Sequence, residues 1–185
     1  MNGYRLSRVA VDYLDRYYEI LKKMKIELSQ IDVSLTASCQ FVYQSIAMNT
    51  AVSENAKNIL RFTTYLPVEA FADKTKEECA GYEKAIGAVE GFCEIDKTKQ
   101  KRLYLQSFDN LFTHYNNSIC KIVEDNNINL DYIRRSIALD RAIVRLCRTA
   151  LRFSDCEQIR PATDMLMNQA LGRIGELEKI YKRIN

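Results

Sequence analysis

The first third of the chain lacks both of the residues that most readily interrupt a helix. Neither glycine nor proline occurs from Tyr4 to Leu66, and all 185 residues include only 6 glycines and 2 prolines. Apolar residues recur here at intervals of three and four, the repeat of one helical face. They are Leu6, Ala10, Tyr13, Tyr17, Ile20, Met24, Leu28, Ile31, Leu35, Cys39, Val42 and Ile46. Residues 4–50 therefore form one long helix, or two with a break near Ser29–Ser34, where propensity is weaker.

Capping residues divide the middle of the chain into further helices. Pro67 is expected to end the helical region before it, because the residue before a proline avoids the α conformation. Thr75 and Glu78 match the capping-box pattern, so a new helix is predicted to start at Thr75 and to run to about Phe92. Asp96 is predicted to cap the next helix.

Two helices are expected in the last third of the chain. The polar segment 125–129 is the clearest loop signal in the sequence. Asn129 is predicted to cap a helix that covers Leu130–Phe153. Pro161 either kinks the last helix or occupies its first turn.

No segment shows the alternation of apolar and polar residues that is typical of a strand. We therefore predict an all-α fold, a single-domain helical bundle over residues 1–185. The bundle should have about five to six helices, with a long N-terminal helix or helix pair.

The segment Val33–Ser53 carries no charged residue. A membrane-spanning helix needs about 20 residues, so its length would be sufficient. Its many serine, threonine, glutamine and asparagine residues make it too polar for a bilayer, and we expect no membrane association. A helix without a charged face is usually surrounded by other helices. An uncharged surface of this size also suggests a homodimer with part of this region in its interface.

Composition narrows the class of protein further. Hydrophobic residues make up 47% of the chain and charged residues 28%, which is ordinary for a globular domain. The net charge of +3 is too small to imply a polyanionic partner by itself. The first residues show no signal-peptide pattern, so we expect a cytoplasmic protein with its 6 cysteines reduced.

The sequence offers little that resembles a catalytic or cofactor site. His114 is the only histidine, so neither a paired Glu-x-x-His di-iron motif nor a zinc site is supported, and a structural role for it is favoured. Phosphate-binding glycine loops are missing. Gly87 and Gly91 are interpreted as marking close helix packing and not membrane dimerisation. No cofactor and no metal are therefore predicted.

The most informative feature is a set of five arginines on the helix predicted for Leu130–Phe153. At about 100° per residue they fall within an arc of roughly 60°, while most of the remaining surface is apolar. We call them the arginine stripe: Arg134, Arg141, Arg145, Arg148 and Arg152. Guanidinium groups suit bidentate contacts with phosphate or carboxylate. Two interpretations stay open, an anion-binding edge and, more favoured, a solvated face partly neutralised by acids of a neighbouring helix.

Asp140 lies on the apolar side of the same helix. A buried carboxylate needs a cation or several hydrogen-bond donors. An internal salt bridge is the favoured interpretation, and a role in binding a ligand or a proton is the alternative.

These features predict a non-enzymatic protein–protein interaction or scaffold module that self-associates or docks a partner helix. The alternative is a regulatory bundle that binds an anionic ligand or nucleic acid through the arginine stripe, although nucleic acid is not favoured. A third hypothesis is an enzyme whose site combines Asp140 with the arginines.

Overall fold

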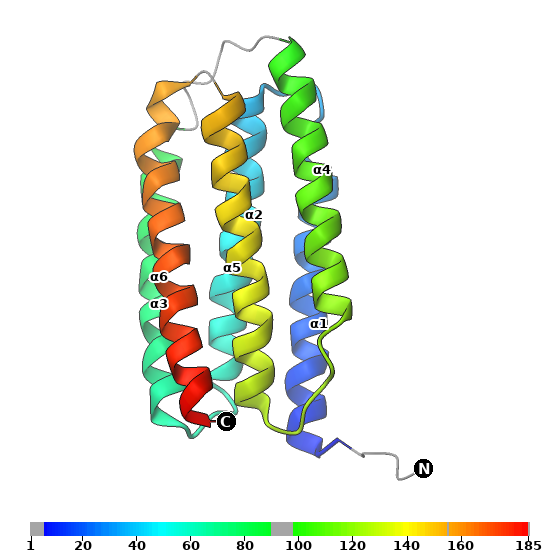
Figure 1. The fold of residues 1–185 in the computed structure, drawn as a ribbon, viewed down its shortest axis with the longest axis vertical. Helices are drawn as coiled ribbons and strands as arrows, with labels where there is room; N and C mark the ends of the chain where they lie inside the picture. Colours follow the sequence, from blue (N-terminus) through cyan, green and yellow to red (C-terminus); the bar gives the residue numbers. More distant parts are fainter. Residues whose placement is uncertain (1–5, 90–97, 155, 185) are drawn as a thin grey trace.

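The computed structural model describes residues 6–89, 98–154 and 156–184, and every regular element in them is helical. Consecutive helices run in opposite directions (Figure 1). The elements are α1 (Arg8–Ser29), α2 (Ala37–Ile59), α3 (Leu66–Gly87), α4 (Thr98–Cys120), α5 (Ile128–Phe153), the short 3-10 helix η1 (Glu157–Ile159) and α6 (Arg160–Ile184). The predicted all-α bundle of five to six helices is thus confirmed.

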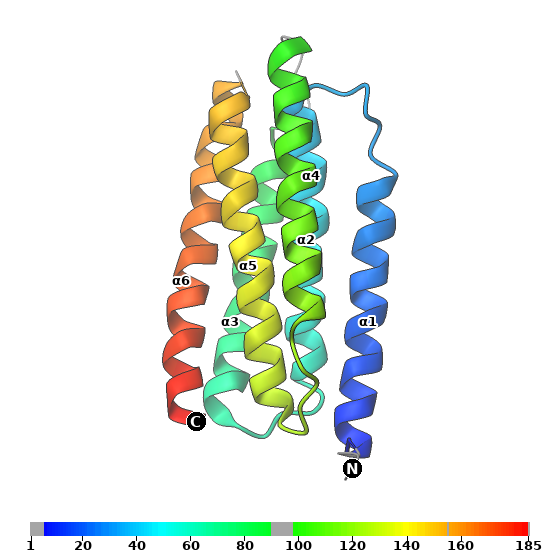
Figure 2. The ribbon, with the colours of Figure 1, turned by 45° about the vertical axis from the view of Figure 1, so that its right-hand side comes forward.

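The helices form two layers of three. Helices α1, α2 and α3 lie side by side in one layer, and α4, α5 and α6 lie side by side in the other (Figures 1 and 2). The middle helices α2 and α5 pack against each other across the layers, and α3 packs against α6. Each layer is therefore a contiguous piece of sequence, and its outer surface is formed mainly by its own three helices.

The N-terminal helical region is two helices, which answers the question left open for residues 4–50. Helix α1 ends at Ser29, and α2 begins after Thr36, whose hydroxyl accepts a hydrogen bond from the Cys39 backbone at 3.2 Å. Helix α1 begins in the same way, with Ser7 accepting from the Ala10 backbone. Hydroxyl side chains that satisfy exposed backbone N–H groups thus set both starts.

The prediction for the start of α3 is wrong. Thr75 lies in the middle of α3, and its hydroxyl donates to the Phe71 carbonyl at 2.8 Å instead of capping a helix. Pro67 does not end a helix but occupies the first turn of α3, where its missing N–H costs nothing. The capping-box pattern misled because a buried threonine can satisfy its own hydroxyl within a helix.

The structure also settles how α5 and α6 begin. Helix α5 is capped by Asn127 and not by Asn129, because the Asn127 side chain accepts from the backbones of both Asn129 and Leu130. Pro161 is the second residue of α6, within its first turn. The predictions for Asp96 and Gly91 lie outside the described residues.

Helix α2 is the most enclosed helix of its layer, with α1 and α3 on either side and α5 across the layers. It contains most of the uncharged segment, whose predicted burial among helices is therefore confirmed. The apolar repeat marks the inward face only in part, since Val42 is buried while Leu35, Cys39 and Ile46 are half-buried. The fully buried side chains include Phe41 and Met48.

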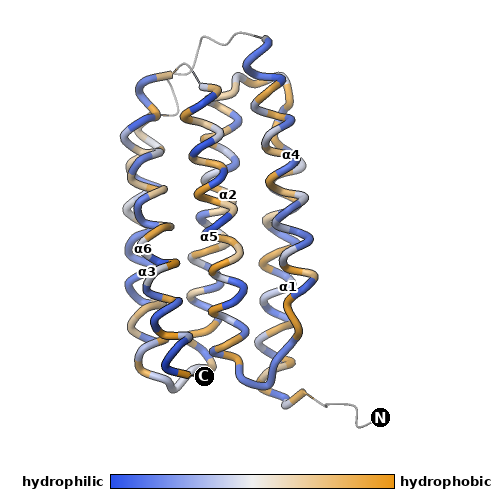
Figure 3. The backbone as a smooth tube through the Cα atoms, in the orientation of Figure 1, coloured by the Kyte–Doolittle hydropathy of each residue, from blue (hydrophilic) through white to orange (hydrophobic). Residues whose placement is uncertain are grey.

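The buried side chains form two apolar clusters, one toward each end of the bundle. Polar residues occupy the level between them on four helices: Asn55, Thr75, Ser136 and Arg173. The amide of Asn55 on α2 donates to Ser136 on α5 at 3.2 Å, which joins the two layers there. Hydrophobic and hydrophilic residues alternate along the labelled helices, as expected for helices with one face toward the core (Figure 3). None of the described helices combines the length and apolar character that a membrane span requires.

A cationic groove over helix α5

The folded chain separates its charges between the two layers. Helices α4, α5 and α6 carry fourteen lysines and arginines against six acidic residues, whereas α1, α2 and α3 carry nine against ten. The modest net charge of the whole chain therefore hides one strongly basic layer. A surface with one sign of charge attracts and orients oppositely charged partners.

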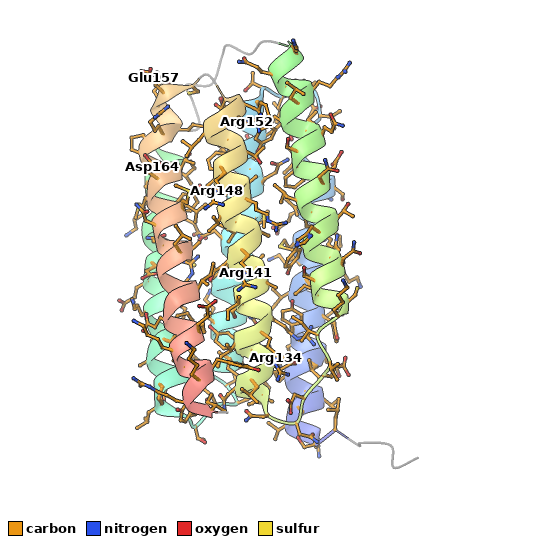
Figure 4. The ribbon with its side chains drawn as sticks, viewed as in Figure 1. Arg134, Arg141, Arg148, Arg152, Glu157 and Asp164 are labelled. Carbon is orange, nitrogen blue, oxygen red and sulfur yellow. The ribbon has the colours of Figure 1, made fainter. Side chains whose placement is uncertain are left out.

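The arginine stripe runs along α5, the central helix of this basic layer. Four of its members are labelled in Figure 4 and follow one another along the helix: Arg134, Arg141, Arg148 and Arg152. Arg134 is half-buried, and the other four arginines are exposed. The stripe is thus the outward-facing part of α5, between α4 and α6.

Three members of the stripe line a groove with a volume of about 480 Å³. Apolar side chains of α4, of α5 and of the segment that joins them supply much of its lining: Leu111, Tyr115, Ile122, Ile137, Ala138 and Ala142. Polar and charged groups complete it: His114, Ser118, Arg134, Arg141, Arg145, Glu178, Tyr181 and Lys182. Grooves of this size with an apolar lining and a few convergent charges are suited to holding a ligand.

Two arginines of the stripe have acidic neighbours. Arg134 is 3.4 Å from the Asp125 carboxylate and lies over the Tyr181 ring, 5.8 Å from its centroid. A hydrogen bond with Tyr181 raises the pKa of Arg134 above its usual value. Arg141 on α5 is 3.3 Å from the Glu178 carboxylate on α6, in a pair that is largely open to solvent. Exposed pairs of this kind contribute only about 0–1 kcal/mol.

The other end of the stripe has no such neutralisation. Within the described part of the chain, no carboxylate lies within 4.0 Å of Arg145, Arg148 or Arg152. Asp164 and Glu157 are found at this end of the bundle (Figure 4), but neither forms an ion pair with the stripe. The guanidinium of Arg152 lies 5.1 Å from the centre of the Phe153 ring. Positive charge is therefore least compensated from Arg145 to Arg152.

Asp140 lies apart from the stripe, inside the bundle. Its carboxylate accepts hydrogen bonds from Nη2 of Arg173 at 2.7 Å and from Nε at 3.1 Å, and both side chains are almost fully buried. Burial raises the pKa of the Asp140 carboxyl, and the Arg173 guanidinium opposes that shift. The structure does not bring Asp140 together with the arginine stripe at the groove, so a shared site has no geometric basis.

A second buried ion pair was not predicted. Arg135 donates from Nε to Asp131 at 3.1 Å, and its guanidinium lies 4.6 Å from the ring centre of Tyr17 and 5.5 Å from that of Tyr18. The i,i+4 spacing of Asp131 and Arg135 is a local signal that could have indicated the pair. The burial of Arg135 could not have been inferred from this spacing, because the two tyrosines against its guanidinium belong to α1, which is distant in the sequence.

His114 is exposed at the edge of the groove. Among the described residues, no cluster of three or more histidine, cysteine or acidic side chains is arranged to hold a metal ion. Comparison with protein-family models, with curated proteins and with solved structures finds no match for this chain.

Proposed function

We propose that this protein is a non-enzymatic interaction module whose groove over α5 binds an acidic segment of a protein partner. The observation that carries the proposal is an apolar groove that continues along α5 into uncompensated arginines: Arg145 lines the groove, and Arg148 and Arg152 follow it on the same helix. Carboxylates of a partner would pair with the guanidinium groups, and its apolar side chains would be removed from water by the lining.

Arginine favours this role over a purely solvated face. Its guanidinium group is weakly hydrated and presents several donors to one carboxylate, so it is the preferred cation at interfaces. Interfaces are likewise enriched in arginine and tyrosine, and the groove has both kinds of residue in Arg141, Tyr115 and Tyr181. The basic layer around the groove would speed the approach of an acidic partner.

Nucleic acid would contact the arginines but not the apolar lining of the groove. Its affinity for proteins comes chiefly from phosphate contacts with basic groups, and base readout requires an element that enters a groove of the duplex. The apolar lining formed by residues such as Leu111, Ile137 and Ala142 would then remain unused. A polypeptide with both acidic and apolar side chains uses the whole surface.

Two fluorescent probes test the proposal on the full-length protein: a synthetic peptide of glutamate, leucine and alanine, and a single-stranded oligonucleotide with the same charge. Fluorescence anisotropy should show that the peptide binds more tightly. Replacing its glutamates with glutamine should weaken binding at least tenfold. Tighter binding of the oligonucleotide, or no binding of either probe, would overturn the proposal.

A pair of double variants locates the binding surface. Arg145→Gln with Arg148→Gln should weaken peptide binding at least tenfold, because these arginines have no internal acidic partners to release. Lys179→Gln with Arg183→Gln removes the same charge from exposed positions of α6 outside the groove and serves as the matched control. If both double variants lose peptide affinity equally, binding depends on the overall positive charge and not on the groove.

A further inference from the structure

We infer that the bound segment is an amphipathic helix that lies along α5, with its apolar half over the groove and its acidic half over Arg145, Arg148 and Arg152. This inference rests on the proposed function and specifies the shape and direction of the ligand. It combines three properties of the surface: the spacing of the stripe, the position of the groove and the distribution of internal acids.

The outward-facing residues of α5 have the spacing of a helix-packing seam. Positions 134, 138, 141, 145, 148 and 152 follow intervals that alternate between four and three, as in the a and d positions of a coiled coil. Ala138 is the one small member, and the other five are the arginine stripe. The seam therefore has the geometry to receive a helix, but its side chains require acidic residues on that helix.

The axial spacing of the arginines distinguishes a helix from an extended strand. Arg141 to Arg152 spans about 16.5 Å along α5 at 1.5 Å per residue, so the three intervals between four arginines average about 5.5 Å. One turn of a partner helix rises about 5.4 Å, so residues on one face of that helix stay in register with successive arginines of the stripe. Same-face residues of a strand repeat at about 6.8 Å and would be roughly 4 Å out of register over this distance.

The apolar part and the uncompensated part of the surface lie at different ends of α5. The groove extends from Arg134 to Arg145, and the two arginines with internal acids, Arg134 and Arg141, both belong to it. Beyond it, Arg148 and Arg152 have no acidic neighbour among the described residues. A complementary partner helix would place leucine-like residues over the groove and carboxylates over the end of α5 that carries Arg148 and Arg152. This is the helix-in-groove mode of recognition.

Three peptides of identical composition test this inference. The first has its leucines on one face of one half and its glutamates on the same face of the other half. The second distributes the same residues around the helix, and the third repeats the first with a central proline that prevents a continuous helix. The first should bind at least tenfold more tightly than the others, and circular dichroism should show that it gains helix on binding.

A spin label on the acidic end of the first peptide tests the direction. It should broaden backbone amide signals near Arg152 and leave those near Arg134 unaffected, and a label on the apolar end should do the reverse. Equal affinity of all three peptides, or binding without helix formation, would overturn the inference while leaving the proposed function intact. Failure of every acidic peptide to bind would instead overturn the proposed function.

Discussion

Arg173 on α6 donates hydrogen bonds from two of its nitrogens to the carboxylate of Asp140 on α5, and both residues are at most 2% exposed. Its third nitrogen, Nη1, reaches Glu78 on α3 at 3.3 Å. One arginine thus connects three helices at the polar level between the two apolar clusters. Removing charges from water is costly, so the pair stabilises the fold only while it stays complete.

Breaking this pair should be strongly destabilising. Asp140→Leu leaves Arg173 with only the half-buried Glu78, and we expect a loss of about 3–5 kcal/mol in the free energy of unfolding. Urea unfolding measures it, with Arg141→Gln as a surface control that should cost about 0–1 kcal/mol. Combining Asp140→Leu with Arg173→Met should recover most of the loss. A double variant as unstable as Asp140→Leu alone would show that packing, and not charge, sets the cost.

Glu178 should compete with an acidic ligand for Arg141. It lines the groove and pairs with Arg141 at 3.3 Å, so Glu178→Gln frees a guanidinium and removes a repelling charge. We expect acidic peptides to bind several-fold more tightly to this variant in anisotropy titrations. Glu176→Gln removes the same charge from a pair with Lys74 outside the groove and should have little effect. Weaker binding to Glu178→Gln would place the ligand elsewhere.

The protein should lose stability in alkali. Burial raises the pKa of Tyr13, Tyr104 and Tyr115 well above the ordinary value of 10.0, and it raises the pKa of the Cys79 thiol from 9.0 to about 12. Between the unfolded and folded pKa values the native state holds more protons than the unfolded state. The stability is therefore complete below about pH 9 and falls as pH rises above it.

Tyrosinate absorbance and far-ultraviolet circular dichroism, followed in one pH titration, test this expectation. The buried phenols should ionise only as the helical signal is lost. Ionisation of all tyrosines with an unchanged helical signal would contradict it.

Shortening one side chain in α2 and one just before it should have unequal effects on stability. Phe41 is fully buried in the larger apolar cluster, so Phe41→Ala should cost about 3–5 kcal/mol in urea unfolding. Leu35 precedes α2 and is half-buried, and Leu35→Ala should cost less than half as much. Equal costs would mean that the segment before α2 is packed as tightly as its middle.

The uncharged segment gives no reason to expect a dimer once its surroundings are known. Its helix α2 is covered by α1, α3 and α5 of the same chain. Light scattering on a sizing column should therefore give the monomer mass of 21.4 kDa at all concentrations. A mass that doubles with concentration would restore self-association, and the peptide experiments would then need to be repeated on the dimer.

Local sequence determined much of the architecture. The three-and-four spacing of apolar residues and the shortage of glycine and proline predict an all-helical bundle, and the lack of charge from Val33 to Ser53 predicts that this segment is surrounded by other helices. The same helical repeat places Arg134, Arg141, Arg145, Arg148 and Arg152 on one side of α5. These properties follow from sequence alone because residues three and four apart share a helical face whatever surrounds the helix.

Only the tertiary structure decided what each face meets. Arg173 and Arg135 do not differ in type from the exposed arginines, yet Asp140 and the α1 tyrosines enclose them. Glu178 lies beside Arg141 because α6 packs on α5, and the stripe borders a groove because α4 and α6 flank α5. Helix pairing brings together residues far apart in the chain, and the free energy of burying each surface depends on all the helices around it. No local pattern contains that information.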